Sequence, residues 1–431
     1  MPRASRRLLT AAVLSAAVLV AGLPAAPRTA AADQVRIHDI QGTTRISPLN
    51  GRQVTDVPGI VTAVRAFGSS RGFWIQDPTP DADPATSEGV FVFTGSTTPR
   101  VAMGDAVLVT GTVSEYYPGG ASTGVQSLTE LTRATWKTVS SGNPLPRAFA
   151  LNPRSIPDTY APQAGGGSIE PLPLRPGTYA LDRYESLEGM RVRVTDAPVV
   201  GPSTRFNEVW VTVEPHRNRT ARGGVLYRSY GDRNGGRVKV TSLLPFPERP
   251  FPQADVGDSL AGVTEGPLDY DQFGGYELQA TVLGELRDGG LEAERTRTQK
   301  RSELAVAAYN VENLSPRDSQ AKFDRLARAV VENLASPDIL ALEEVQDDNG
   351  ATDDSVVSAE ETLRRFTDAI AAAGGPAYRW RQIDPVDDAD GGQPGGNIRV
   401  VFLFNPERVS FTDRPGGDAT TAVKAGERDG R

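Results

Sequence analysis

The sequence contains no cysteine, two histidines and three methionines among its 431 residues. Without cysteine the chain cannot form disulfides, thiolate zinc sites or cysteine nucleophiles, so its stability depends on buried cores and on any metal ions that it binds. The two histidines, His38 and His216, both lie in the β-rich part of the chain that precedes residue 290. A histidine acting as general base or acid is therefore excluded from residues 304–431.

Long apolar runs are absent beyond the N-terminus. Residues 1–32 combine three early arginines with an apolar run over 8–23 and an A-x-A site before Asp33. This is the layout of a secretory signal peptide, and the run is short for a membrane span. We therefore expect a secreted, extracellular protein without a membrane anchor.

The chain also lacks an excess of positive charge. Its formal net charge is −8, from 46 basic and 54 acidic residues, and removal of the four arginines in residues 1–32 would bring it to −12. A protein of this charge has no general attraction for nucleic acid or for an anionic membrane. Any recognition of phosphate must therefore be local, through arginines or bound cations.

Glycine and proline divide the chain into segments. The 44 glycines and 33 prolines are concentrated between short runs of β-branched and aromatic residues, which favours strands and turns over helical bundles. We predict two all-β modules, at residues 33–136 and 181–286. The Pro/Gly-rich linker at 137–180 contains little that could pack, and a charged linker follows the second module at 287–303.

The two β modules resemble each other in sequence. "MGDAVLVTGTVSEYY" (103–117) parallels "VGDSLAGVTEGPLDY" (256–270), and "GFWIQD" (72–77) parallels "NEVWVTVEP" (207–215). In the first pair, Gly-Asp turns into an apolar strand with a glycine inside it, which often marks a place where a small sheet closes. Together the pairs resemble the tandem OB-fold-like modules that precede the nuclease domain in bacterial extracellular nucleases.

Residues 304–431 have a different pattern, in which strands alternate with helices, and this order indicates a layered α/β domain. Strands are predicted at 304–311, 338–345, 378–384 and 397–406, and amphipathic helices at 321–334 and 359–374.

Polar residues follow the first two of these strands. Asn310 ends one strand, and Glu343 and Glu344 end the next. Ligands of layered α/β sheets gather at strand ends, and an amide oxygen with carboxylates suits Mg²⁺, Mn²⁺ or Ca²⁺. On residue types alone a capping asparagine and a solvated acidic pair remain the alternatives.

A family resemblance favours the metal site. "AAYNVENL" (307–314), followed by "SPDILALEEVQD" (336–347), resembles the opening of the endonuclease/exonuclease/phosphatase superfamily, which has the DNase I-like fold. The resemblance implies the first half of a four-layer α/β sandwich and metal-dependent hydrolysis of phosphodiesters in DNA, or in RNA. It implies that Glu344 binds catalytic Mg²⁺ or Mn²⁺ and that Asn310 supports the metal. In "NIRVVFLFNP" (397–406) it makes Arg399 a candidate phosphate contact.

The remaining motifs of that superfamily are not found in this sequence. Its Asp-x-Asn motif, its histidine paired with an acid and its final Asp-His have no counterpart after residue 406, and the α/β region has about half the usual length. We therefore expect an incomplete nuclease domain that is inactive as this chain, with one sheet face uncovered. Nucleic acid, DNA above all, is the expected partner, and no obligate protein partner is evident.

Two alternatives remain open. In the first, the β modules bind an oligonucleotide or a polysaccharide and the α/β domain is vestigial, because OB-like barrels bind single strands with basic grooves and stacked aromatics. The second is a phospholipid or inositol phosphodiesterase of the same superfamily. The aromatic residues considered for stacking are Phe73, Trp74, Tyr116, Tyr117 and Trp210.

Overall fold

The computed structural model of the protein describes residues 34–413 and 417–421. The chain divides into two compact units, residues 1–291 and 292–431, with the boundary inside the predicted charged linker. The predicted signal peptide at residues 1–32 lies outside the described residues. Within the described ranges, no helix is both long and apolar enough to cross a membrane.

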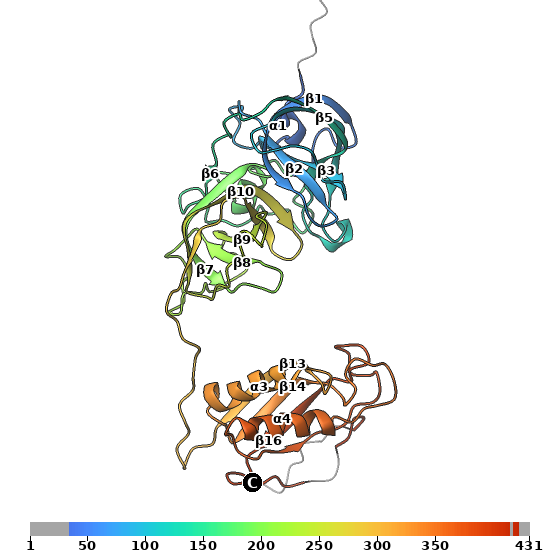
Figure 1. The fold of residues 1–431 in the computed structure, drawn as a ribbon, viewed down its shortest axis with the longest axis vertical. Coiled ribbons are helices and arrows are strands. Elements are labelled where there is room, and N and C mark those ends of the chain that lie inside the picture. The colour runs from blue at the N-terminus through green and yellow to red at the C-terminus, as the bar shows by residue number, and fades with distance from the viewer. Residues whose placement is uncertain (1–33, 414–416, 422–431) are drawn as a thin grey trace, which may run out of the picture. The chain divides into compact units, whose positions relative to one another are not determined.

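The first module of the first unit is a closed barrel with the strand order β1-β2-β3-β5-β4 (Figure 1). Neighbouring strands are antiparallel, except that β3 and β5 are parallel. Val107, Val109 and Val113 of β4 point into the core with the two-residue period of a strand, and Gly111 occupies the inward position between the last two. Helix α1 (Ile37–Gln41) adds two fully buried isoleucines. The strands are β1 (Gln53–Arg65), β2 (Arg71–Gln76), β3 (Gly89–Gly95), β4 (Ala106–Tyr116) and β5 (Leu128–Ser140), with the 3₁₀ turn η1 (Ala121–Thr123) between the last two.

The second module repeats this topology. Its central strands follow the order β7-β8-β9-β11-β10, β10 also pairs with β7, and β9 and β11 are the parallel pair. Helix α2 (Ala180–Glu185) precedes β7 as α1 precedes β1. The segments predicted to be related therefore occupy equivalent strands, β2 with β8 and β4 with β10. The strands are β7 (Arg191–Gly201), β8 (Val209–Thr212), β9 (Arg237–Ser242), β10 (Ser259–Asp271) and β11 (Gly275–Ala280), flanked by β6 (Phe149–Ala150) and β12 (Glu285–Arg287).

The segment at 137–180 differs from the expectation of a linker with little packing. It begins with the end of β5 and includes β6, and Leu151, Ile156 and Leu174 are all buried. The amide of Leu174 donates to the carbonyl of Thr43, 2.9 Å away. Single apolar residues between prolines and glycines carry no periodic signal, so only the tertiary structure reveals that they are buried.

A polar interface joins the two modules of the first unit. Arg45, which precedes β1, is almost fully buried and forms an ion pair with the buried Asp182 of α2. The Ser87 hydroxyl donates to the carbonyl of Glu188 (2.6 Å), and the Thr129 amide donates to the Glu188 carboxylate (2.9 Å). These bonds cross the interface, although the Oε2 atom of Glu188 is buried without a hydrogen-bond partner among the described residues, and the two modules form one compact unit.

The second unit is a four-stranded sheet with the order β13-β14-β16-β15 (Figure 1). Strands β13 and β14 are parallel, whereas β16 is antiparallel to both of its neighbours. Both helices contribute to a single core with one face of the sheet, through residues such as Phe323 and Phe366. The elements are β13 (Val306–Leu314), α3 (Gln320–Arg328), the π turn η2 (Ala329–Asn333), β14 (Ile339–Val345), α4 (Glu360–Ala372), β15 (Arg379–Arg381) and β16 (Arg399–Phe404).

The other face of this sheet carries exposed apolar side chains. Val306 is 64% exposed, Val400 55% and Phe402 48%. Along β16, the exposed Val400 and Phe402 alternate with the buried Val401 and Leu403. The described part of the unit is therefore a two-layer α/β structure. The further layers of a four-layer sandwich are not among the described residues.

Buried carboxyl groups should make the first unit less stable at alkaline pH. Burial raises the pKa of Glu130, Glu185 and Glu277 to about 7 in each case. A carboxyl whose pKa is higher in the folded state contributes stability below its unfolded pKa, and this contribution is lost as the pH rises through the folded pKa. We predict that the free energy of unfolding, measured with urea, falls between pH 5 and pH 8. Glu130→Gln should reduce this fall by on the order of 1 kcal/mol. An unchanged or rising free energy over that range would contradict the prediction.

Candidate functional site

The three predicted site residues of the second unit lie near one edge of its sheet. Because β13 and β14 are parallel, their C-terminal ends meet, and Asn310 is the register partner of Glu343. Strand β16 runs in the opposite direction and begins at the same edge, where Arg399 is opposite Val345. The topology therefore brings Asn310, Glu344 and Arg399 together, although Asn310 and Arg399 are 89 positions apart in the sequence.

Both parallel strands are irregular at this edge. Glu344 has a φ of 60°, and the register with β16 shifts between Leu342 and Val345. In β13, Glu312 (φ 58°) and Asn313 (φ 54°) are also left-handed, beside a second register shift. Left-handed backbone is unfavourable for residues other than glycine and often marks functional sites. The bulge at Glu344 allows two successive glutamates to face one cavity.

That cavity has a volume of about 590 Å³ and is lined by Glu343, Glu344, Asp390 and Arg399, together with apolar side chains. Asn310 is not among its lining residues, and its side-chain oxygen accepts a hydrogen bond from the Glu312 amide (2.8 Å). The glutamate oxygens fit the chemistry of Mg²⁺, Mn²⁺ or Ca²⁺, which prefer hard oxygen ligands. Glu343 and Glu344 would hold such an ion, with the second lone pair of the Asn310 oxygen still available.

Arg399 is buried, and its guanidinium is engaged within the unit. It donates to the carbonyl of Asn397 (2.8 Å), to the carbonyl of Val357 and to Asp384 (3.0 Å). Burial lowers the pKa of Arg399, although Asp384 opposes this effect. In the described structure Arg399 therefore fixes the loops around the cavity, and phosphate binding by this residue stays a prediction.

Asp347, which the sequence did not single out, also shapes this edge. Asp347 is fully buried and accepts hydrogen bonds from the Asn397 side chain (3.1 Å) and the Asn349 amide (3.0 Å). Burial raises the pKa of Asp347. Asp347 ends the motif "SPDILALEEVQD", but no local pattern distinguishes it from the more exposed acids Glu343, Glu344 and Asp348 near it.

The first unit contains a separate cleft of about 670 Å³ between its two modules. Tyr184 and Tyr276 stack there with ring centroids 5.3 Å apart, and Tyr270 meets Tyr276 edge-on at 5.2 Å. The Tyr184 hydroxyl donates to the carbonyl of Gly235 (2.7 Å), and the Tyr276 hydroxyl donates to Glu185. These bonds fix the rings, so the cleft has a rigid aromatic wall.

Two arginines supply positive charge to this cleft. The guanidinium of Arg233 lies over the ring of Tyr160, 5.6 Å from its centroid, and its Nε donates to the Tyr230 carbonyl. Arg237 is exposed, and among the described residues its guanidinium has no hydrogen-bond or ion-pair partner. Burial raises the pKa of the Tyr160 hydroxyl, and the positive charges of both arginines partly oppose this rise. The cleft thus combines aromatic faces with available cationic groups.

Most of the aromatic residues proposed from sequence lie elsewhere. Phe73 and Trp74 are fully buried and cannot stack on a ligand. The Tyr117 hydroxyl donates to Glu170 (2.9 Å), whereas Tyr116 is exposed and Trp210 is partly buried. The tyrosines of the cleft come from separate segments, so they form no local sequence motif.

Comparison with known proteins finds a family model and similar solved structures. Residues 150–288, which correspond to β6 through β12, match a family model described as a domain of unknown function, DUF8508. No curated protein matches the chain. One similar solved structure is fission yeast Pot1 with single-stranded DNA, at 13% identity and a TM-score of 0.20, covering 58% of this chain and 88% of that chain.

The left-handed backbone at Glu344 predicts opposite effects of glycine at two adjacent positions. Glu344→Gly should leave the unit equally stable or stabilise it by about 0.5–1 kcal/mol, because glycine adopts positive φ without strain. Glu343→Gly, the matched control, has no positive φ to relieve and should destabilise the strand by roughly 0.5–1 kcal/mol. Hydrogen exchange of peptides that cover 339–345 measures both effects. Equal destabilisation by the two variants would show that the Glu344 backbone is not strained.

Proposed function

We propose that the second unit is the metal-binding part of a secreted nuclease, a divalent-metal-dependent hydrolase of phosphodiesters that acts on DNA, or on RNA. The observation that carries this proposal is the pair of bulged parallel strands, which presents Glu343 and Glu344 to one cavity next to Asn310 and Arg399. The motifs in β13 and β14 that resemble the endonuclease/exonuclease/phosphatase superfamily support it. The sequence of residues 1–32 supports secretion.

The cavity suggests how the residues divide the work. A divalent cation, when bound, stabilises negative charge that develops on a phosphate. Glu344 would supply a carboxylate to that ion, and Asn310 would orient the site through its bond to the Glu312 amide. Arg399 keeps the surrounding loops in place and adds positive charge at the cavity wall.

We expect little turnover by this chain, because the second unit has no histidine to activate water. If the chain cleaved plasmid DNA with Mg²⁺ and lost this activity in Glu344→Gln, that result would show that a residue other than histidine acts as the base. Phospholipid and inositol phosphate substrates, assayed in parallel, distinguish the related phosphodiesterases from a nuclease.

Metal binding tests the assignment of Glu344. Titration of the full chain with Mn²⁺, followed by the electron paramagnetic resonance of the free ion, should show a site that Glu344→Gln weakens at least about tenfold. Glu343→Gln should have a smaller effect.

The matched control is Glu407→Gln. Glu407 is exposed and lies just beyond the C-terminal end of β16, which is the opposite edge of the sheet. The Glu407→Gln variant should bind Mn²⁺ as the unmodified chain does. If Glu344→Gln bound as many equivalents of Mn²⁺ as the unmodified chain with equal affinity, the strand-end site would be refuted.

A second candidate function is binding of single-stranded nucleic acid by the first unit, and the cleft between its modules favours it. Both modules have the strand order and the parallel pair expected of OB-type barrels. These two features support the reading. Tyr184 and Tyr276 are buried in the core, but Tyr160 and Tyr270 are partly exposed and their rings can stack on bases. The arginines of the cleft can contact phosphate. Because the chain as a whole is acidic, binding would depend on this local charge.

Arginine substitutions in the cleft test this second function. A fluorescent oligothymidine should bind the chain at micromolar concentrations, and the combined Arg233→Gln and Arg237→Gln variant should bind about tenfold more weakly with a smaller salt dependence. Arg100→Gln, an exposed arginine of the first barrel, is the control and should bind normally. Equal binding by the cleft variant would refute the assignment. Tighter binding of a neutral oligosaccharide would instead favour the polysaccharide alternative.

A further inference from the structure

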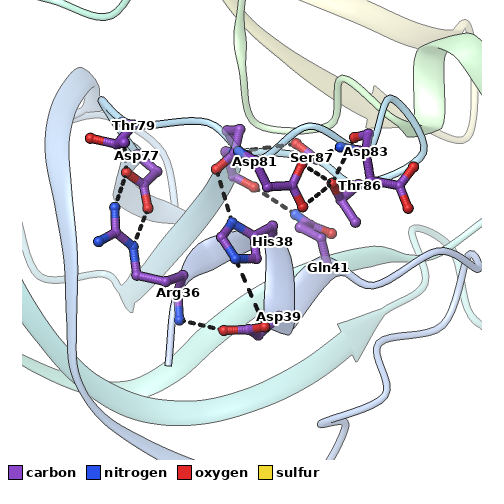
Figure 2. Close-up of polar contacts among 12 residues, drawn as sticks. Arg36, His38, Asp39, Gln41, Asp77, Thr79, Asp81, Asp83, Thr86 and Ser87 are labelled. Carbon is purple, nitrogen blue, oxygen red and sulfur yellow. Dashed lines mark hydrogen bonds and ion pairs between the residues drawn. The ribbon is translucent and has the colours of Figure 1, made fainter. Parts of the chain in front are cut away.

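Three potential metal ligands converge on one side of the first barrel. His38 comes from α1, Asp77 directly follows β2, and Glu88 directly precedes β3. One ligand atom from each lies within 4.8 Å of the others. Figure 2 shows His38 of this group between Asp77 and the loop that carries Asp81. Within the described residues this is the one group of three such side chains at this spacing, and it is remote in sequence from Glu344.

Two of these ligand atoms are buried and face each other. The Nδ1 atom of His38 and the Oε2 atom of Glu88 are 3.5 Å apart, and neither has a hydrogen-bond partner. Glu88 is only 4% exposed, so its carboxylate receives little stabilisation from solvent. When the imidazole proton is on Nε2, the Nδ1 lone pair and the carboxylate oxygen cannot satisfy each other, but a cation between them satisfies both.

The surrounding contacts orient both side chains toward that point. The Nε2 atom of His38 lies 3.9 Å from the Asp39 carboxylate, so a proton on Nε2 would lie near that carboxylate and leave the Nδ1 lone pair free. The Asp81 amide donates to the other oxygen of Glu88 (2.7 Å).

Asp77 is the third ligand and is already partly engaged. Its oxygens accept from the Arg36 guanidinium, with Nε at 2.6 Å, and from the Thr79 amide at 2.9 Å. A carboxylate has about four lone-pair positions, so one remains for a metal. Arg36 offsets one of the negative charges, and the group with Asp39 remains net negative, as a dication requires.

From this geometry we propose that His38, Asp77 and Glu88 bind a transition-metal dication such as Zn²⁺. An imidazole nitrogen with two carboxylates is a donor set typical of Zn²⁺, Co²⁺ or Mn²⁺, whereas Mg²⁺ and Ca²⁺ prefer oxygen alone. Zn²⁺ bonds of about 2.0–2.2 Å separate ligand atoms by roughly 3–4 Å. The His38–Glu88 distance already fits this range, and Asp77 needs a small movement. The site does not depend on the proposed function of the second unit.

Metal titration of the untagged full chain, stripped with a chelator, tests this proposal. Zn²⁺ should bind with one equivalent assigned to this site, by calorimetry, and Co²⁺ should give visible absorption bands of a nitrogen- and oxygen-ligated ion. His38→Ala and Glu88→Gln should each weaken Zn²⁺ binding at least about tenfold. His216→Ala removes the other histidine, which is exposed, and should leave binding unchanged.

Four outcomes would overturn the proposal. The first is equal binding of Zn²⁺ by His38→Ala and the unmodified chain. The second is an absence of binding, in which case a proton on His38 alone would satisfy Glu88. The third is loss of the tight site in Glu344→Gln, which would assign the ion to the second unit. The fourth is loss of the site in His216→Ala. If circular dichroism shows that Glu88→Gln is unfolded, Zn²⁺ binding by His38→Ala decides the proposal, because His38 is partly exposed and its replacement disturbs the core less.

Discussion

The close approach of two backbones, at Gly89 and Gly189, is the constraint on which the first unit depends. A Cβ on Gly89 would lie 2.2 Å from the carbonyl carbon of Gly189, and Gly189 also has a φ of 71°. Side chains at these positions would push the modules apart. The contact fixes the start of β3, where Glu88 precedes Gly89, and it keeps Gln126 of the first module within reach of Tyr270 and Tyr276, which line the cleft. The candidate zinc site and the cleft therefore both rely on one interface.

The interface between the modules is polar although it is buried, and this makes it sensitive to the loss of any one polar partner. Arg45 and Asp182 satisfy each other, and the loss of one partner would leave an uncompensated charge in the interior. The raised pKa values of Glu185 and Glu188 arise from the same burial. Polar contacts of this kind require exact partners, so they fix the orientation of the modules more strictly than apolar surfaces would.

The second unit shows how a regular sheet can create an irregular site. Parallel pairing aligns Asn310 with Glu343, and the left-handed residue at 344 changes which side chains face the cavity. The period of the strand alone would send successive residues to opposite faces. Both glutamates line one cavity because the ladder breaks at this point.

Local patterns in the sequence determined the alternation of strands and helices in residues 304–404, the internal repeat of the β modules and the position of acids at a strand end. These features depend on periodicity and turn residues, which act over a few positions. The tertiary structure alone decided that residues 137–180 pack, that Arg399 is buried in a network with Asp384, and that His38 meets Glu88. It also decided that Phe73 and Trp74 belong to the core. Each of these depends on contacts between distant segments, and such contacts leave no signature in a single sequence.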